Sequence, residues 1–164
     1  MTHIREYLEQ DAESAGMLIA DTYAKFNLRF ATPEQRDRLL GPFLHAHSQD
    51  PVHREAIVRV IHSRTVLVAE DEGEIVGVLR GSKDRLHSLF VRSDCHRQGI
   101  GRALLDQFEQ ACLQLGGGVI RLASSLYAVP FYQHMGYFKS TGVRRGWSFQ
   151  GQGLRWQPMK KILG

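Results

Sequence analysis

The chain has 164 residues, which is long enough for one domain with a hydrophobic core and too short for two typical domains. Its 43% hydrophobic and 23% charged residues are ordinary for a globular protein, and no apolar run approaches the roughly 20 residues of a membrane span. The net charge of +4 is mild, so we expect neither a membrane nor a nucleic-acid partner.

The two cysteines and the N-terminus bear on location. Cys95 falls in a polar loop and Cys112 in a predicted helix, a pattern that favours reduced thiols over a disulfide framework. The first residues, MTHIREYLEQD, lack the apolar core of a signal peptide. We therefore expect a cytoplasmic protein with a single domain over residues 1–164.

The first part of the chain reads as one strand followed by three helices. The polar, histidine-bearing stretch 27–50 is its least regular part, and we interpret it as an excursion that faces the substrate. The expected elements are a strand over 4–8, a helix from an Asp11 cap to about Phe26, a helix PEQRDRLL opened by Pro33 and stopped by Gly41-Pro42, and a helix opened by Pro51.

The second part of the chain alternates strands and helices. The expected elements are a hairpin of strands 65–69 and 74–79, a strand over 86–91, a helix over 101–115 ended by three glycines, a strand over 119–123, a short helix from Pro130 to Met135, and two last strands in the tail 137–163. These elements predict one α+β domain with a mixed sheet.

The segment LHSLFVRSDCHRQGIGR joins a strand, a basic loop and a glycine pair that opens a helix. A helix N-terminus exposes unpaired N–H groups and favours phosphate, and Gly99 and Gly101 place no Cβ in the way of a ligand. Arg92, Arg97 and Arg102 surround the turn and add positive charge. The segment therefore predicts a pocket for a phosphorylated cofactor.

Two common phosphate loops do not fit this segment. A Walker A loop requires Lys-Ser/Thr after its second glycine, where this chain has Arg102-Ala103. The dinucleotide fingerprint requires a third Gly or Ala where Leu104 stands, and its first glycine directly follows a strand. A glycine-capped surface turn with incidental arginines stays open as the simpler interpretation.

A family resemblance is carried by two motifs in order. LFVRSDCHRQGIGRALL resembles the acyl-CoA-binding motif of the GCN5-related N-acetyltransferase (GNAT) superfamily, and SSLYAVPFYQHMGYFKSTG resembles the second signature of that family. One departure is His96, which stands where the family has Arg or Gln three positions before the first glycine. Because the turn acts through backbone N–H groups, the substitution touches one side-chain contact only.

The resemblance implies a fold, an activity and a binding site. The implied fold is GNAT-like, with a mixed, mostly antiparallel, splayed sheet of about 6–7 strands flanked by about 4–5 helices. The implied activity is transfer of an acetyl group from acetyl-CoA, as cosubstrate, to a primary amine of a small molecule or peptide, and a homodimer is compatible with the family. The implied coenzyme-binding residues are Leu89, Phe90, Val91, Arg97, Gln98, Gly99, Ile100, Gly101, Arg102, Ala103 and Ser125.

The resemblance also suggests how the coenzyme lies. The pyrophosphate would meet the turn at 98–103, and the pantetheine arm would pair with the backbone of 89–91 while strand 119–123 splays away. Plain core packing explains Leu89 and Val91 equally well, and a strand-end cap explains Ser125.

Two side chains are candidates for catalysis. Tyr132 matches the family tyrosine that protonates the leaving thiolate, although core packing is the common role of such a tyrosine. Many relatives have a glutamate base where Arg85 stands here, and His87 lies two residues on with a pKa suited to proton removal. A solvent-facing or satisfied histidine is the alternative for His87. The Leu89 N–H is the expected donor to the thioester carbonyl.

Other chemistries are weaker. His45 and His47 form an H-x-H without a third ligand at fixed spacing, so we expect no metal. Cys95 before a helix N-terminus suggests an acyl-cysteine intermediate, yet it lies at the pyrophosphate end of the site. A catalytically silent acyl-CoA-binding module is the main alternative function, and a nucleic-acid module would rest on Arg144-Arg145 near Trp147 alone.

Overall fold

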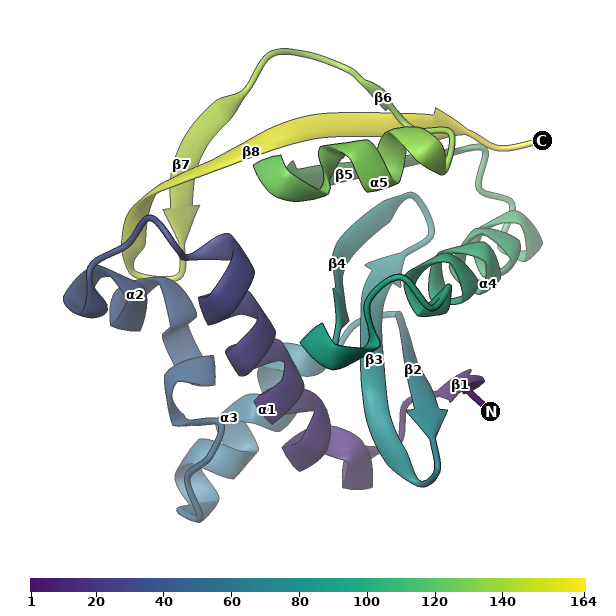
Figure 1. Cartoon of the computed structure of the whole chain (residues 1–164). Coiled ribbons are helices and arrows are strands. Elements are labelled where there is room, and N and C mark those ends of the chain that lie inside the picture. The colour runs from purple at the N-terminus through teal and green to yellow at the C-terminus, as the bar shows by residue number, and fades with distance from the viewer.

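The computed structural model describes residues 1–164, and one mixed sheet of eight strands runs through it (Figure 1). The strand order is β1-β2-β3-β4-β5-β8-β6, with β7 paired to β8, and only the β4–β5 pair is parallel. The strands are β1 His3–Glu6, β2 Thr65–Asp71, β3 Glu74–Ser82, β4 Arg85–Val91, β5 Val119–Ser125, β6 Phe138–Lys139, β7 Arg144–Ser148 and β8 Gly151–Ile162.

Five α-helices flank the sheet, and α1 and α4 pack on opposite faces of it (Figure 1). One core lies between α4 and the sheet, around Phe108 and Leu79, and the other lies under α1 and α3, around Ile19 and Val78. The helices are α1 Ala12–Thr22, α2 Pro33–Leu40, α3 Pro51–Ile61, α4 Ile100–Gln114 and α5 Val129–His134. None of them is both long and apolar enough to span a bilayer.

The local start and turn signals of the sequence act as expected. Thr32 Oγ1 accepts a hydrogen bond from the Gln35 N–H at the start of α2, and Asp50 caps α3 through the Val52 N–H at 2.9 Å. Glu72 and Gly73, both at positive φ, form the two-residue turn of the β2–β3 hairpin. The mixed, mostly antiparallel class is thereby confirmed.

One expectation about the first helix is wrong, and one is refined: Asp11 does not cap it, and its expected end near Phe26 lies in a π-helical turn. The Asp11 side chain does not cap α1, because it binds the Arg5 guanidinium (Nη1–Oδ2 2.8 Å) and accepts from the Leu8 N–H. The ion pair outcompetes the cap because both partners carry full charge. The α-helix ends at Thr22, and residues Tyr23–Asn27 continue it as a wider π-helical turn. Such turns often re-aim side chains at functional sites.

The tail holds three strands rather than the two that we expect from its weak alternation. The 12-residue β8 pairs with β5 over its second part and with β7 over its first, so both partners share one long strand. The short β6 adds two register pairs beside β8. The sheet therefore has eight strands, more than the expected number.

A partly buried ion pair attaches α4 to the last strand. Glu109 accepts from Lys161 Nζ (2.9 Å to each oxygen) and from the Tyr137 hydroxyl at 3.1 Å. Glu109→Ala leaves the quarter-exposed Lys161 without its partner, so we expect the free energy of unfolding to fall by about 2 kcal/mol. Asp106→Ala on the same helix removes only an exposed 3.9 Å pair and is expected to cost at most about 0.5 kcal/mol. Equal losses in urea denaturation would contradict this ranking.

Candidate active site

The parallel pair β4–β5 separates soon after it forms. Its register covers only Arg85–Arg121 and Leu86–Leu122, although both strands continue beyond these pairs. From residue 88 onward this edge of β4 therefore has no strand beside it. The predicted splay is present, and it leaves backbone groups that an extended ligand arm can pair with.

A β-bulge lies at the point where the two strands part. Arg80 is opposite Ser88 and Gly81 is opposite Leu86, so His87 is the extra residue of β4. Bulges redirect side chains and are frequent beside active sites. The exposed His87 side chain lies on the wall of the cleft, as does that of Arg85.

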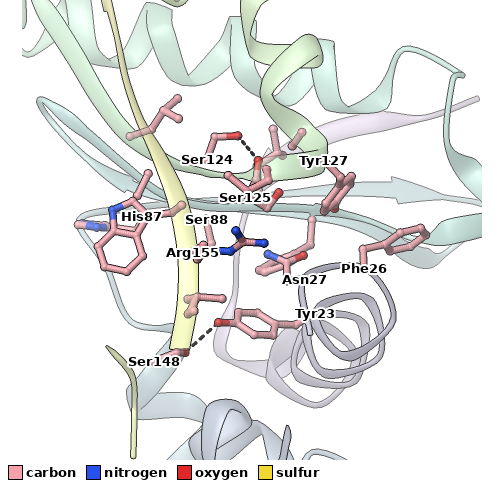
Figure 2. Close-up of a pocket in the computed structure, with 18 of the residues that line it drawn as sticks. Tyr23, Phe26, Asn27, His87, Ser88, Ser124, Ser125, Tyr127, Ser148 and Arg155 are labelled. Carbon is pink, nitrogen blue, oxygen red and sulfur yellow. Dashed lines mark hydrogen bonds between the residues drawn. The ribbon is translucent and has the colours of Figure 1, made fainter. Parts of the chain in front are cut away.

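The splay opens into a cleft of about 610 Å³ (Figure 2). The π-helical turn after α1, the strands β4 and β5, helix α5 and the β7–β8 hairpin all contribute to its walls. Tyr132, His87, Leu89, Phe90 and Ser125 line the same cleft, so the structure brings together residues predicted from both motifs. The apolar remainder of the wall includes Tyr23, Phe26, Phe30, Phe43, Trp147, Phe149 and Trp156.

Tyr132 is the most buried titratable group of the cleft. It lies on α5, is 7% exposed, and packs edge-on against Phe131 and Tyr137 with ring centroids 5.1 and 5.8 Å away. Burial, and secondarily the nearby Tyr127, raises the pKa of Tyr132 well above its ordinary value. The hydroxyl therefore keeps its proton throughout the working pH range and acts as a hydrogen-bond donor.

The turn before α4 has the backbone geometry of an anion site. Gly99 has φ +83°, and a Cβ built there meets nothing within 4 Å. Arg97 is also left-handed, at φ 62°, and such alternation points successive N–H groups to one side. The first turn of α4 leaves the N–H groups of Ile100, Gly101 and Arg102 without helix acceptors.

Two residues of the turn have additional roles. The Ala103 N–H already donates to the Gly99 carbonyl at 2.9 Å, so that amide belongs to the helix. A Cβ at Gly101 would lie 3.4 Å from Phe131 Cζ, so this glycine also allows α5 to pack against α4. Gly99 is consequently the glycine whose missing side chain faces open space.

The arginines around the turn differ in availability. Arg92 is held by Glu74 at 2.8 Å and by Asp94 at 2.7 Å, so it is not free to bind an anion. Arg97 makes no ion pair, and Arg102 makes only a 3.9 Å contact with Asp106. Arg97 and Arg102 are thus the two that remain available beside the turn.

Residues 89–91 of β4, which are expected to pair with the pantetheine arm, present backbone groups rather than side chains to a ligand. Leu89 and Val91 pack on the α4 core, and Phe90 packs on the opposite core with its ring 5.8 Å from Tyr23. The Val91 carbonyl accepts a hydrogen bond from His96 Nε2 at 2.7 Å. His96, the departure from the family pattern, therefore fixes the end of β4 beside the turn.

Aromatic rings connect the cleft to the turn. Phe26 stacks on Tyr127 across the cleft mouth, at 5.6 Å between centroids, and its other neighbour is the His96 ring at 5.1 Å. The two cleft aromatics appear side by side at one end of Figure 2. The turn residues 97–103 lie beyond this aromatic contact and do not line the cleft.

His87 has a lowered pKa. Partial desolvation by the cleft wall is the largest cause, followed by the charges of Arg80 and Arg85, whereas Asp84 acts in the opposite direction. A lowered pKa keeps the imidazole neutral near pH 7, which is the form that accepts a proton. No aspartate or glutamate lines the cleft, so His87 is its one side chain suited to act as a base.

The cysteine alternative is contradicted. Cys95 is 8% exposed, and burial together with its hydrogen bond to Asp94 raises the pKa of the thiol rather than lowering it. It also lies in the turn and not among the cleft residues. The H-x-H histidines are used elsewhere, since His45 stacks on His53 and His47 bonds Asp21 at 2.9 Å.

Several contacts of the cleft residues were not anticipated from sequence. Arg80 spans from β3 to the end of α3, where it donates to the carbonyls of Val60 and Ile61 at 2.8 and 2.9 Å. The Tyr23 and Ser148 hydroxyls are 2.8 Å apart and join the π-helical turn to β7 (Figure 2). Asn27 Oδ1 is buried without a donor. No local pattern reveals the contacts of Arg80 or of Tyr23 with Ser148, because each joins segments that are distant in the chain.

A sheet that splays between two parallel strands, next to a helix N-terminus suited to a phosphate group, is typical of acyl-CoA-dependent acyltransferases. The family model described as an acetyltransferase (GNAT) domain matches residues 31–163, and the chain belongs to this family. The motif resemblance is thereby confirmed.

Solved structures share the fold. A GCN5-related N-acetyltransferase from Rhodopseudomonas palustris has 21% identity and a TM-score of 0.79, covering 99% of this chain and 96% of its own. The PaiA N-acetyltransferase from Thermoplasma acidophilum, in complex with coenzyme A, has 17% identity and a TM-score of 0.72, covering 99% of each chain. An aminoglycoside 6′-acetyltransferase type Ii has 20% identity and a TM-score of 0.62, covering 98% and 96%.

Proposed function

We propose that this protein transfers the acetyl group of acetyl-CoA to a primary amine by direct attack within a ternary complex. One observation carries the proposal: Tyr132 and His87 face a single cleft where β4 and β5 part, next to a helix start suited to a pyrophosphate. The coenzyme A complex of the Thermoplasma structure, which shares this fold, supports the assignment of the donor.

The chain offers two fits to acetyl-CoA. The open turn around Gly99 suits the pyrophosphate, with Arg97 and Arg102 beside it. The unpaired edge of β4 suits the amide groups of the pantetheine arm, and Ser125 at the end of β5 lies across from it in the cleft. The thioester then lies near Tyr132 and the bulge at His87.

The proposed chemistry needs a neutral amine, a polarised carbonyl and a stabilised thiolate. The amine nitrogen attacks the thioester carbon, a C–N bond forms, and the C–S bond breaks. The amine proton passes to His87, directly or through water, and the Leu89 N–H donates to the carbonyl oxygen. The sulfur electrons leave as a thiolate that accepts a hydrogen bond from Tyr132.

A pH profile tests the role of His87. Because its neutral form is the active one and its pKa is lowered, kcat is expected to rise with pH through an inflection below 6.5. His87→Gln is expected to remove that inflection and to lower kcat about 10- to 100-fold. Arg85→Gln is expected to move the inflection upward, because it removes a positive charge that disfavours the imidazolium. An unchanged acid limb in His87→Gln would exclude His87 as the base.

Release of free thiol from acetyl-CoA, measured against a panel of amines and confirmed by the mass of the acetylated product, tests the function itself. The expected result is amine-dependent release that is lost in Gly99→Asp. Binding of coenzyme A without transfer to any amine would instead support the silent acyl-CoA-binding module.

A further inference from the structure

The charge of the cleft is one-sided. Four arginines and one histidine line it, without any aspartate or glutamate. The arginines come from separate elements: Arg29 follows the π-helical turn, Arg80 is on β3, Arg85 on β4 and Arg155 on β8. The fold therefore concentrates positive charge in the cleft from four places.

These arginines have no carboxylate partner within the protein. None of the four forms an ion pair, in contrast to Arg5 and Arg92, which each bind two carboxylates. Arg80 is half-buried and uses its guanidinium on two helix-end carbonyls and, at 3.4 Å, on Ser88 Oγ. The Arg155 guanidinium makes no hydrogen bond within the chain, and it extends into the middle of the cleft, near Asn27 (Figure 2).

The phosphates of the coenzyme do not account for this charge. They are assigned to the turn around Gly99, and no residue of that turn lines the cleft. The acetyl end of the coenzyme, which is assigned to the cleft, is uncharged. The free positive charge therefore faces the second substrate.

The cleft also has an apolar side. Trp147 and Phe30 are 65% and 56% exposed, and both line the cleft together with Phe149 from the β7–β8 turn. Large aromatic side chains that stay exposed at a cleft rim indicate contact with an apolar group of a ligand.

We propose that the acceptor is a small amine that also carries a carboxylate and an apolar group, as an apolar α-amino acid does. Arg155 binds the carboxylate, Arg80 and Arg85 supply supporting charge, and Trp147 with Phe30 contacts the apolar group. This inference rests on the proposed acetyl transfer and names its substrate class. Polyamines and aminoglycosides are excluded, because several cationic groups would enter a cleft without a carboxylate.

The same charge assists the chemistry. Positive neighbours disfavour an ammonium and so lower its pKa, which increases the neutral amine that can attack. A plain amine gains this effect but is repelled on entry. The carboxylate of an amino acid offsets this repulsion. The same arginines therefore bind the amino acid and lower the pKa of its ammonium group.

Matched acceptors test the proposal. Phenylalanine, phenylalaninamide and 2-phenylethylamine share the apolar group and the amine, and only the first carries a carboxylate; leucine and leucinamide form a second pair. We expect kcat/KM to be at least tenfold higher for each acid than for its amide. The comparison is stringent because the ammonium of an amino amide is more acidic, which favours the amide.

Substitution of Arg155 assigns the preference. Arg155→Gln is expected to lower kcat/KM at least tenfold for the acid and less than threefold for the amide. Most of the preference for the acid over its amide is then lost. Arg121→Gln is the matched control, because Arg121 is exposed on β5, forms no ion pair and lies outside the cleft. Arg155→Lys is expected to recover part of the loss, because it keeps the charge without the planar fork.

Binding separates failure of this proposal from failure of the proposed function. The products N-acetylphenylalanine and N-acetylphenylalaninamide are compared as ligands by thermal shift, and only the acid is expected to raise Tm, with loss of the shift in Arg155→Gln. Transfer with equal or better use of amides overturns the substrate class alone. Acid-selective binding without transfer to any amine overturns the acetyltransferase activity and leaves the carboxylate site standing.

Discussion

Gly99→Asp is expected to weaken coenzyme A binding at least 100-fold, or about 2.7 kcal/mol. The left-handed φ of +83° is tolerated by aspartate better than by most residues, and open space surrounds the new Cβ, so the fold is expected to persist. The carboxylate then lies where the pyrophosphate is assigned, and it repels that group at the start of α4. Isothermal titration with coenzyme A measures the loss.

Two variants separate charge, size and backbone strain. Gly99→Asn has nearly the same size and left-handed tolerance without the charge, so we expect at most a tenfold loss. Gly116→Asp introduces the same residue at another left-handed glycine with open space, at the far end of α4, and should leave the affinity unchanged. Near-native affinity in Gly99→Asp would show that the coenzyme phosphates bind elsewhere.

The sequence predicts best where local chemistry decides the structure. The glycine-bearing turn at 72–73, the helix starts at Pro33 and Pro51, and the turn around Gly99 are set by nearby residues, and each is present. The two motifs likewise predict that Tyr132 lies on a short helix and that residues 98–102 form the turn before a helix. Each motif combines a strand or helix with its own turn, so these features are local.

The remaining features depend on distant contacts. Asp11 was expected as a cap, yet Arg5 and the register of β1 against β2 direct it into an ion pair. The bulge at His87 is defined by the pairing of β4 with β3 and has no signal of its own in the sequence. Arg80 and Arg155 are 75 positions apart in the chain, and both line the cleft because β3 and β8 belong to the same sheet. The positive charge of this cleft is therefore not predictable from any one segment.

Tyr132→Phe is expected to lower kcat about 100-fold with little change in coenzyme A affinity. The ring stays packed against Phe131 and Tyr137, so only the hydroxyl is lost. Its raised pKa makes the hydroxyl a poor acid compared with a thiol of pKa near 8.5, so we expect it to stabilise the thiolate by a hydrogen bond instead of by full proton transfer. For the same reason, Tyr132 should add no basic limb to the pH profile below about pH 10.

Tyr137→Phe is the matched control for that measurement. Tyr137 is also buried, and its hydroxyl donates to Glu109 on α4, outside the cleft. Its removal is expected to lower the free energy of unfolding by about 1 kcal/mol while kcat stays within a factor of two. Tyr132→Phe should show the opposite pattern, with a large loss in kcat and a small loss in the free energy of unfolding. Full turnover by Tyr132→Phe, in a burst or single-turnover experiment in which chemistry limits the rate, would remove Tyr132 from the catalytic step and leave it as a core residue that lines the cleft.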